Sequence, residues 1–251
     1  MLKGKKGLVL GVANEHSIAY GVATKLILEG AEVFASCLNH KAYEKVAPLF
    51  STGSIEVHPC NVEDPLELQQ FVELAAKKFG KFDFIVHSIA WAPLEELHGR
   101  VIDSSSIGFS RAMEVSCHSF AEIAHLAVPY MPDGGSMVTM TYLGAEEVVP
   151  HYGLMGPIKA ALESLVRYMS VELGPYGIRV HAVSPGPIFT RAASGIQSFD
   201  ELLENAIKKS PLGRSVTIEE VANLTIFLCD DLSSGMTGQT IFVDGGCHAV
   251  A

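Results

Sequence analysis

The stretch GLVLGVANEHSIAYG (residues 7–21) decides the fold class of this 251-residue chain. Residues 7–12 form an apolar run without polar alternation, which is typical of a strand covered on both faces. Gly11 allows a tight turn, Ser17 suits a helix N-cap, and Gly21 is expected to let the helix pack close to the sheet. The stretch therefore predicts a strand, a turn and a helix whose N-terminus can receive a pyrophosphate, although it lacks the G-x-G-x-x-G pattern.

Strands and helices continue to alternate along the chain. Further strands are predicted over residues 32–36, 55–59, 84–88, 136–140, 179–183 and 240–243, and helices over 17–29, 41–50, 66–79, 109–128, 152–173 and 219–229. This alternation implies right-handed crossovers and a parallel sheet. We predict one α/β domain over residues 1–251, a doubly wound, Rossmann-type parallel sheet of about seven strands. Residues 186–215, rich in Gly, Pro and Ser, are predicted to form a substrate-binding loop.

The composition narrows the class of protein. Hydrophobic residues make up 48% of the chain and charged residues only 18%, below the share of roughly 25% that is usual in globular proteins. This balance indicates a large buried surface. The net charge of −10 argues against nucleic-acid binding through a basic face. No apolar run approaches the roughly 18 residues of a membrane span, so we expect no membrane insertion.

The cysteines and histidines carry no binding pattern. The five cysteines are odd in number and form no C-x-x-C pair, which predicts reduced thiols in a cytoplasmic protein. His87, His118, His151 and His181 share no ligand spacing, so we expect no metal site.

The N-terminal apolar run is followed by residues 14–16 (NEH) rather than a cleavage context, which favours a first strand over a signal peptide.

The end of the second predicted strand bears on the choice of nicotinamide cofactor. In doubly wound folds an acid at this point binds a ribose 2′-hydroxyl, and an arginine accommodates a 2′-phosphate. Residues 36–41 read SCLNHK and contain neither. The displaced His40 and Lys41 do not replace the arginine, so the sequence favours NAD over NADP while leaving NADPH open. Lys41 also fits a solvated residue in the first turn of the next helix.

A tyrosine and a lysine form the most specific pair. Tyr152 and Lys159 are seven residues apart, which is two helical turns and predicts one shared helix face. A lysine near a phenol lowers the tyrosine pKa, and its ammonium can also bind ribose hydroxyls. Pro157 lies between them and indicates that the regular helix begins near it. The spacing is common by chance, but a strand precedes it and Ser184-Pro185-Gly186-Pro187 follows it.

Together these motifs resemble the short-chain dehydrogenase/reductase superfamily, and more narrowly its enoyl-[acyl-carrier-protein] reductase branch of bacterial fatty-acid synthesis. The resemblance runs from the first strand to the last residues. The motifs that carry it are Gly11-x5-Ser17-Ile18-Ala19-Tyr20-Gly21, Asn61-Val62, His87-Ser88-Ile89-Ala90, Thr141–Glu146 (TYLGAE), Tyr152-x6-Lys159, Ala192–Ile196 (AASGI) and Val243-Asp244-Gly245-Gly246.

The resemblance implies hydride transfer from NADH, or from NADPH, to the β-carbon of a trans-2-enoyl thioester. By position it implies Tyr142, Tyr152 and Lys159 as catalytic residues, and it places Ala92 with both tyrosines in the substrate site. The cofactor-binding residues that it implies are Gly11, Ser17, Ile18, Leu38, Asn61, Val62, Ile89, Lys159, Ile188, Phe189, Thr190, Arg191 and Ala192.

The resemblance also implies partners: an acyl chain on acyl carrier protein, or on coenzyme A, and a homotetramer. The acidic stretch SFDELLE (residues 198–204) is expected to slow the approach of an acidic carrier. Two other functions stay open. Thr139 stands thirteen residues before Tyr152, where ketone reductases of the superfamily carry a serine, so a 3-oxoacyl (ketone) reductase is one alternative. A catalytically silent, cofactor-binding regulatory protein is the other.

Overall fold

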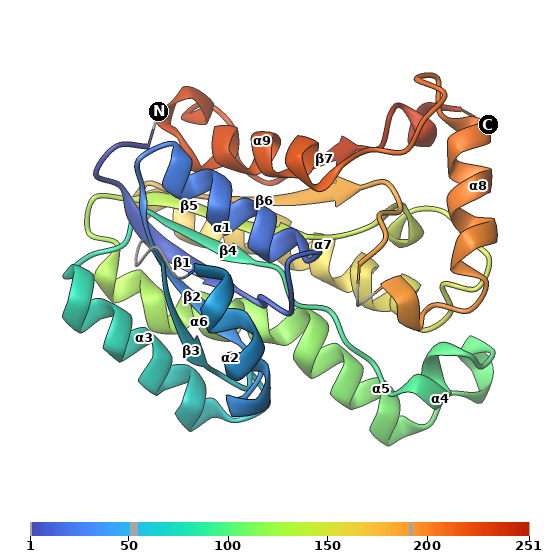
Figure 1. The fold of residues 1–251 in the computed structure, drawn as a ribbon, viewed down its shortest axis with the longest axis horizontal. Coiled ribbons are helices and arrows are strands. Elements are labelled where there is room, and N and C mark those ends of the chain that lie inside the picture. Colours follow the sequence, from blue (N-terminus) through green and yellow to red (C-terminus); the bar gives the residue numbers. More distant parts are fainter. Residues whose placement is uncertain (1, 51–54, 191–192, 251) are drawn as a thin grey trace.

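A parallel sheet of seven strands forms the centre of the computed structural model, which describes residues 2–50, 55–190 and 193–250 (Figure 1). The strand order is β3-β2-β1-β4-β5-β6-β7, so the order reverses between β1 and β4. This is the doubly wound single-domain sheet that the alternating sequence predicts. The strands are β1 (Lys6–Leu10), β2 (Glu32–Cys37), β3 (Ile55–Pro59), β4 (Phe84–His87), β5 (Gly135–Met140), β6 (Ile178–Pro185) and β7 (Gln239–Val243).

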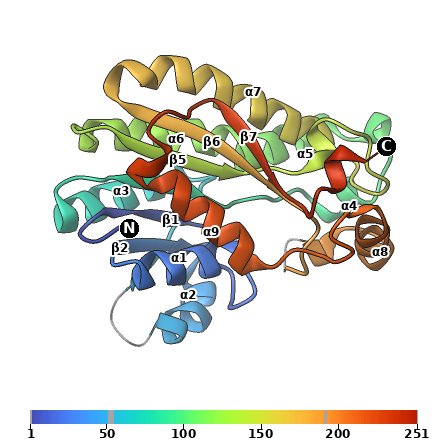
Figure 2. The same cartoon turned by 90° about the horizontal axis from the view of Figure 1, so that it is seen from above.

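Helices cover both faces of the sheet. The α-helices of the described segments are α1 (Ile18–Leu28), α2 (His40–Val46), α3 (Pro65–Phe79), α4 (Leu94–Leu97), α5 (Ser106–Met113), α6 (Ser119–Ala127), α7 (Met155–Leu173), α8 (Phe199–Lys209) and α9 (Ile218–Cys229). Buried side chains of α3, α6 and α7 pack on one face, and those of α1, α2 and α9 on the other (Figure 2). Both faces of β1 and β4 are therefore buried, which explains the unbroken apolar runs over residues 8–10 and 84–86.

One predicted helix, residues 109–128, is divided in the structure. A π-helical turn over Glu114–His118 separates α5 from α6. The wider turn carries Ser116, whose hydroxyl donates to the carbonyl oxygen of Trp91 at 2.7 Å and accepts from its amide at 2.7 Å. The turn thus ties the helix to the loop that follows β4. Such insertions often lie at functional sites and do not alter apolar periodicity enough to be predicted from it.

The predicted start of the helix over residues 152–173 is wrong by three residues, because α7 begins at Met155. His151 and Gly153 have φ values of 63° and 51°, which place Tyr152 in a turn before the helix. Pro157 lies in the first turn of α7, where its missing N–H would have no helical partner. Tyr152 and Lys159 therefore do not share a regular helix face as their spacing predicts.

Gly11 and Gly21 of the opening stretch make different close contacts. Gly11 has φ +99°, and a Cβ there would lie 2.3 Å from the carbonyl oxygen of Ser88, so the turn requires glycine. A Cβ on Gly21 would lie 2.2 Å from Cγ2 of Ile218 at the start of α9. Gly21 therefore allows helix-to-helix packing of α1 on α9, and the expectation that it serves contact with the sheet is wrong.

Candidate active site

The predicted site residues follow the carboxyl ends of the strands, and parallel strands bring these ends to one edge of the sheet. The structure places Gly11, Ser17 and Ile18 after β1, Leu38 after β2, Asn61 and Val62 after β3, Ile89 and Ala92 after β4, Tyr142 after β5, and Ile188, Phe189 and Thr190 after β6. Tyr152 precedes α7, and Lys159 lies on it. Arg191 and Ala192 lie outside the described residues.

The turn after β1 is built around backbone amides. Ser17 is the N-cap of α1: its hydroxyl accepts from the amide of Tyr20 at 3.3 Å and donates to the carbonyl oxygen of Asn14 at 2.7 Å. The amide of Gly11 donates to the hydroxyl of Ser36 at 3.2 Å. A helix N-terminus next to a glycine turn offers N–H groups and a positive dipole end to an anion. The arrangement can therefore hold a phosphate group.

The ends of β2 and β3 form the other part of the predicted cofactor site. Leu38 is 59% exposed, whereas Val62 is buried. The Asn61 side chain accepts from the amide of Glu63 at 3.2 Å, and the Asn61 amide donates to Glu67 at 2.8 Å. These bonds hold the loop after β3 in one conformation. The side chain of Asn39 caps α2 through the amide of Ala42 at 3.0 Å, so it is not free to replace the missing acid.

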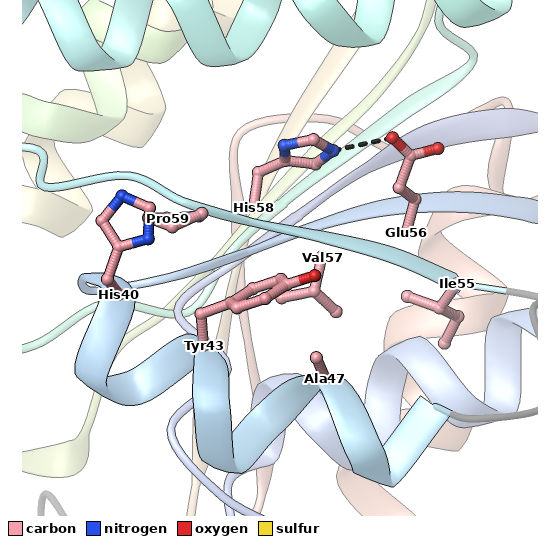
Figure 3. A pocket seen from close by; sticks show the side chains of 8 residues that line it. All are labelled: His40, Tyr43, Ala47, Ile55, Glu56, Val57, His58 and Pro59. Carbon is pink, nitrogen blue, oxygen red and sulfur yellow. Dashed lines mark hydrogen bonds and ion pairs between the residues drawn. The ribbon is translucent and has the colours of Figure 1, made fainter.

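A cavity of about 500 Å³ lies beside this region, between α2 and the edge strand β3 (Figure 3). Its wall carries the ring of Tyr43 and a hydrogen bond of 2.7 Å between His58 Nε2 and Glu56 Oε1. The residues that line it are His40, Tyr43, Ala47, Ile55, Glu56, Val57, His58 and Pro59. None of them is a predicted cofactor or substrate residue, so the cavity is separate from the candidate active site.

Tyr142 and Tyr152 meet at the carboxyl end of β5. Their ring centroids are 4.8 Å apart, with an angle of 62° between the ring planes. Burial raises the pKa of both phenols above the ordinary value, and the charges of Cys247 and Asp244 add to the rise at Tyr142. Both hydroxyls are protonated at neutral pH and can act as hydrogen-bond donors.

Lys159 is buried on α7, with 3% of its surface exposed. Its ammonium donates to the carbonyl oxygen of Met140 at 2.8 Å, and burial lowers its pKa to about 8. The expectation that Lys159 lowers the tyrosine pKa is wrong for this structure: burial raises the pKa of Tyr152, and the negative charge of Glu163 adds to the rise. The Lys159 ammonium is instead hydrogen-bonded to the end of β5.

The sequence interpretation missed three residues beside this lysine. Glu163 lies close enough for its charge to raise the pKa of Lys159, and Cys117, a buried thiol of the π-helical turn, faces the same lysine. The hydroxyl of Thr141 donates to Oε1 of Glu163 at 2.7 Å. The spacing of Lys159 and Glu163, four residues apart on one helix, could have indicated Glu163. Cys117 had no such signal, because it arrives from a distant element.

Thr139, the residue that kept ketone reduction open, has no exposed surface. Its hydroxyl lies 3.0 Å from Nδ1 of His87, and Nε2 of His87 lies 2.9 Å from the hydroxyl of Ser119. Burial lowers the pKa of His87 to about 3, so the imidazole is neutral and bridges the two hydroxyls. Thr139 is thus engaged in a buried network that joins β4, β5 and α6.

Gly144 lies against the ring of Tyr152, and this contact yields a prediction. A Cβ on Gly144 would lie 2.3 Å from Cδ1 of Tyr152, so Gly144→Ala must displace the ring. We expect kcat to fall about tenfold and stability to fall by about 1–3 kcal/mol, the usual cost of overpacking. Gly174→Ala is the matched control, because no atom lies within 4 Å of a Cβ there. Equal kcat values for the two variants, with crotonyl thioester as substrate, would contradict the prediction.

Two further properties concern the whole described region. None of its helices is both long and apolar enough to cross a membrane. Its His, Cys, Asp and Glu side chains form no group of three or more that could hold a metal ion.

Comparison with known proteins agrees with this geometry. The family model described as "Enoyl-(Acyl carrier protein) reductase" matches residues 11–248. The chain is 45% identical to "Enoyl-[acyl-carrier-protein] reductase [NADH] 1" of Rhizobium meliloti, over 100% of this chain and 92% of the relative.

Solved structures of similar proteins agree over the full length. The crystal structure of enoyl-[acyl-carrier-protein] reductase (NADH) from Aquifex aeolicus superposes with a TM-score of 0.96 at 41% identity, covering 100% of this chain and 98% of the other. The reductase of Anaplasma phagocytophilum in complex with NAD gives 0.95 at 42% identity, covering 100% and 96%. The resemblance drawn from the motifs is thereby confirmed: the chain belongs to the enoyl-(acyl carrier protein) reductase family.

Proposed function

We propose that the chain is an NADH-dependent reductase of trans-2-enoyl thioesters in fatty-acid synthesis, acting on the carbon–carbon double bond. The observation that carries the proposal is the meeting of Tyr142 and Tyr152, with ring centroids 4.8 Å apart, at the end of β5 to which the buried Lys159 is hydrogen-bonded. All three lie at the sheet edge where doubly wound folds bind their ligands. The names of the relatives, which specify NADH and acyl carrier protein, support the same assignment.

The residues at this edge fit a nicotinamide dinucleotide. The turn at Gly11 has no space for a Cβ, and Ser17 caps the helix that begins there. The Lys159 ammonium has three donors, of which one is used by Met140, so others remain for ribose hydroxyls. When bound, NADH supplies the hydride. The residues that we propose to hold it are Gly11, Ser17, Ile18, Leu38, Asn61, Val62, Ile89, Lys159, Ile188, Phe189, Thr190, Arg191 and Ala192.

The two tyrosines serve the substrate. Reduction at the β-carbon moves negative charge onto the thioester carbonyl oxygen, and a fixed donor at that point lowers the barrier. The Tyr152 hydroxyl, protonated because burial raises its pKa, is this donor. The further substrate residues of the proposal are Tyr142, whose ring packs on that of Tyr152, and Ala92, which is buried after β4. The proton that reaches the α-carbon needs only an ordinary acid or a water chain.

The buried hydroxyl of Thr139 favours enoyl reduction over ketone reduction. A serine in that position of a ketone reductase would bind the substrate oxygen, but the Thr139 hydroxyl lies 3.0 Å from His87 in a fully buried network. To reach a substrate it would have to leave this partner inside the core, where an unpaired polar group is costly. Intact Tyr142, Tyr152 and Lys159 likewise argue against a silent regulatory protein.

The substrate loop, the carrier and the assembly complete the proposal. The single domain covers residues 1–251, with the substrate-binding loop over about 186–215, in which Phe189 packs on Phe199 at 5.6 Å. The acyl chain arrives on acyl carrier protein or coenzyme A in the cytoplasm. Exposed Tyr168 and Val171 on α7 and exposed Tyr176 after it leave apolar surface that a homotetramer would cover.

Parallel assays test the function. Loss of nicotinamide absorbance is followed with crotonyl or octenoyl thioesters and with acetoacetyl thioester, each with NADH and with NADPH. We expect turnover of the enoyl thioesters with NADH as the better cofactor. Turnover of acetoacetyl thioester alone would assign a ketone reductase, and binding of NADH without any turnover would assign a regulatory protein.

A further inference from the structure

Two side chains of α7 hold the segment that leads into Tyr142. Lys159 Nζ donates to the carbonyl oxygen of Met140 at 2.8 Å, and Glu163 Oε1 accepts from the hydroxyl of Thr141 at 2.7 Å. Lys159 and Glu163 are one helical turn apart, and Met140 and Thr141 are adjacent in the chain. We call these four residues the β5–α7 clamp. Its effect is to join the strand end that carries Tyr142 to the helix that follows Tyr152.

The clamp is buried, and the two side chains that α7 contributes to it are ionisable. Lys159 is 3% exposed and Glu163 is 5% exposed. Burial raises the pKa of Glu163, and the hydrogen bond from Thr141 and the opposite charge of Lys159 counter that rise in part. Thr141 is also fixed through its backbone, since its amide donates to the carbonyl oxygen of Val183 at 2.8 Å. Thr141 thus has one anchor in β6 and one in α7.

We propose that Glu163 is a positioning residue of the active site, which holds Tyr142 in place through Thr141. The same carboxylate lies one helical turn from Lys159, where its charge favours the ammonium. This inference rests on the proposed function, in which Lys159 binds the cofactor ribose. Lys159 would serve the ribose with its remaining donors while it holds Met140. The bond between Glu163 and Thr141 serves the segment before Tyr142 alone.

The charges around the clamp set its pH dependence. Lys159 is faced by Glu163 on its own helix, by Cys117 of the π-helical turn and by the neutral His87 of β4. Glu163 is faced by Lys159 and Arg167 of α7 and by Glu146 of the loop after β5. Burial lowers the pKa of Lys159 to about 8, and the Glu163 charge opposes this decrease. Without that charge, Lys159 loses its proton at a lower pH.

Two substitutions separate the hydrogen bond from the charge. Thr141→Val removes the donor and keeps the carboxylate. We expect kcat to fall about tenfold, the size of losing one hydrogen bond to a charged group, with the NADH dissociation constant within about twofold of wild type. Thr141→Ser keeps the hydroxyl and is expected to restore kcat. Thr225→Val is the matched control, because Thr225 also donates a buried hydroxyl hydrogen bond, to Val221 at 2.9 Å, in α9.

Glu163→Gln keeps an acceptor for Thr141 and removes the charge. We expect the Lys159 pKa, read from the ¹³Cε resonance of labelled lysine, to fall by about 0.5–1 unit, a typical shift for loss of one nearby charge. The pH at which NADH binding weakens is expected to fall with it. An unchanged Lys159 pKa would overturn the electrostatic part of the inference.

A measurement that needs no turnover tests the clamp independently of the proposed function. In protein labelled with ¹⁹F-tyrosine, the Tyr142 resonance is assigned with Tyr142→Phe. Thr141→Val is expected to shift or broaden this resonance, and Thr225→Val is expected to leave it unchanged. If the wild type reduces no enoyl thioester, the proposed function fails, while the resonance and the Lys159 pKa still test the clamp. An unshifted resonance, or equal kcat values for the two valine variants, would refute the positioning role.

Discussion

Replacing Tyr152 with phenylalanine is expected to lower kcat about 100-fold, because removal of one donor aimed at a developing oxyanion usually costs about 10²–10³ in rate. The ring remains, so its packing against Tyr142 and Gly144 is kept. The NADH dissociation constant should therefore stay within about twofold of wild type, a change too small to indicate a lost contact. Steady-state kinetics with crotonyl thioester and a fluorescence titration with NADH measure the two quantities.

The control for this variant is Tyr130→Phe, which removes a phenol hydroxyl beside Phe82, outside the candidate site. Its kcat should match wild type. Tyr142→Phe is measured in parallel because the two rings are neighbours. A larger loss of kcat in Tyr142→Phe than in Tyr152→Phe would reverse the roles that we assign to the two tyrosines.

Replacing Lys159 with methionine is expected to weaken NADH binding about 10- to 100-fold, which corresponds to the loss of a hydrogen bond from a charged group of about 1.5–3 kcal/mol. Wild-type affinity in this variant would contradict the role proposed for Lys159. Lys81→Met is the control, since Lys81 pairs with Asp133 at 2.6 Å on the surface and precedes β4 at the opposite edge of the sheet.

The same variant has an expected effect on stability with a defined sign. Burial lowers the folded-state pKa of Lys159 to about 8, from 10.5, so folding disfavours its protonated form. The unfolded chain binds more protons in this pH interval, and wild-type stability should rise as the pH increases from about 8 toward 10.5. Lys159→Met removes this titration, so the stability of the variant should not show the same rise over this interval. Calorimetry across this pH range measures both changes.

The strands could be predicted because burial on both faces requires apolar residues at consecutive positions. Residues 8–10 and 84–86 are apolar on both faces and become β1 and β4, with helices on either side of the sheet. The motifs also placed Tyr142, Tyr152 and Lys159 on neighbouring elements. The start of α7 was less predictable, because the positive φ of His151 and Gly153 depends on the contacts of that turn rather than on periodicity.

The sequence by itself determined the fold class and the family, because apolar runs, turn residues and motif spacing are local properties of the chain. The partners of the site residues were decided only by the tertiary structure. Lys159 bonds Met140, nineteen residues earlier in the chain, and Gly21 packs on Ile218. The hydroxyl of Thr139 is held by His87 in the neighbouring strand. Each of these contacts joins elements that are distant in the chain, and sheet order and helix packing alone bring them together.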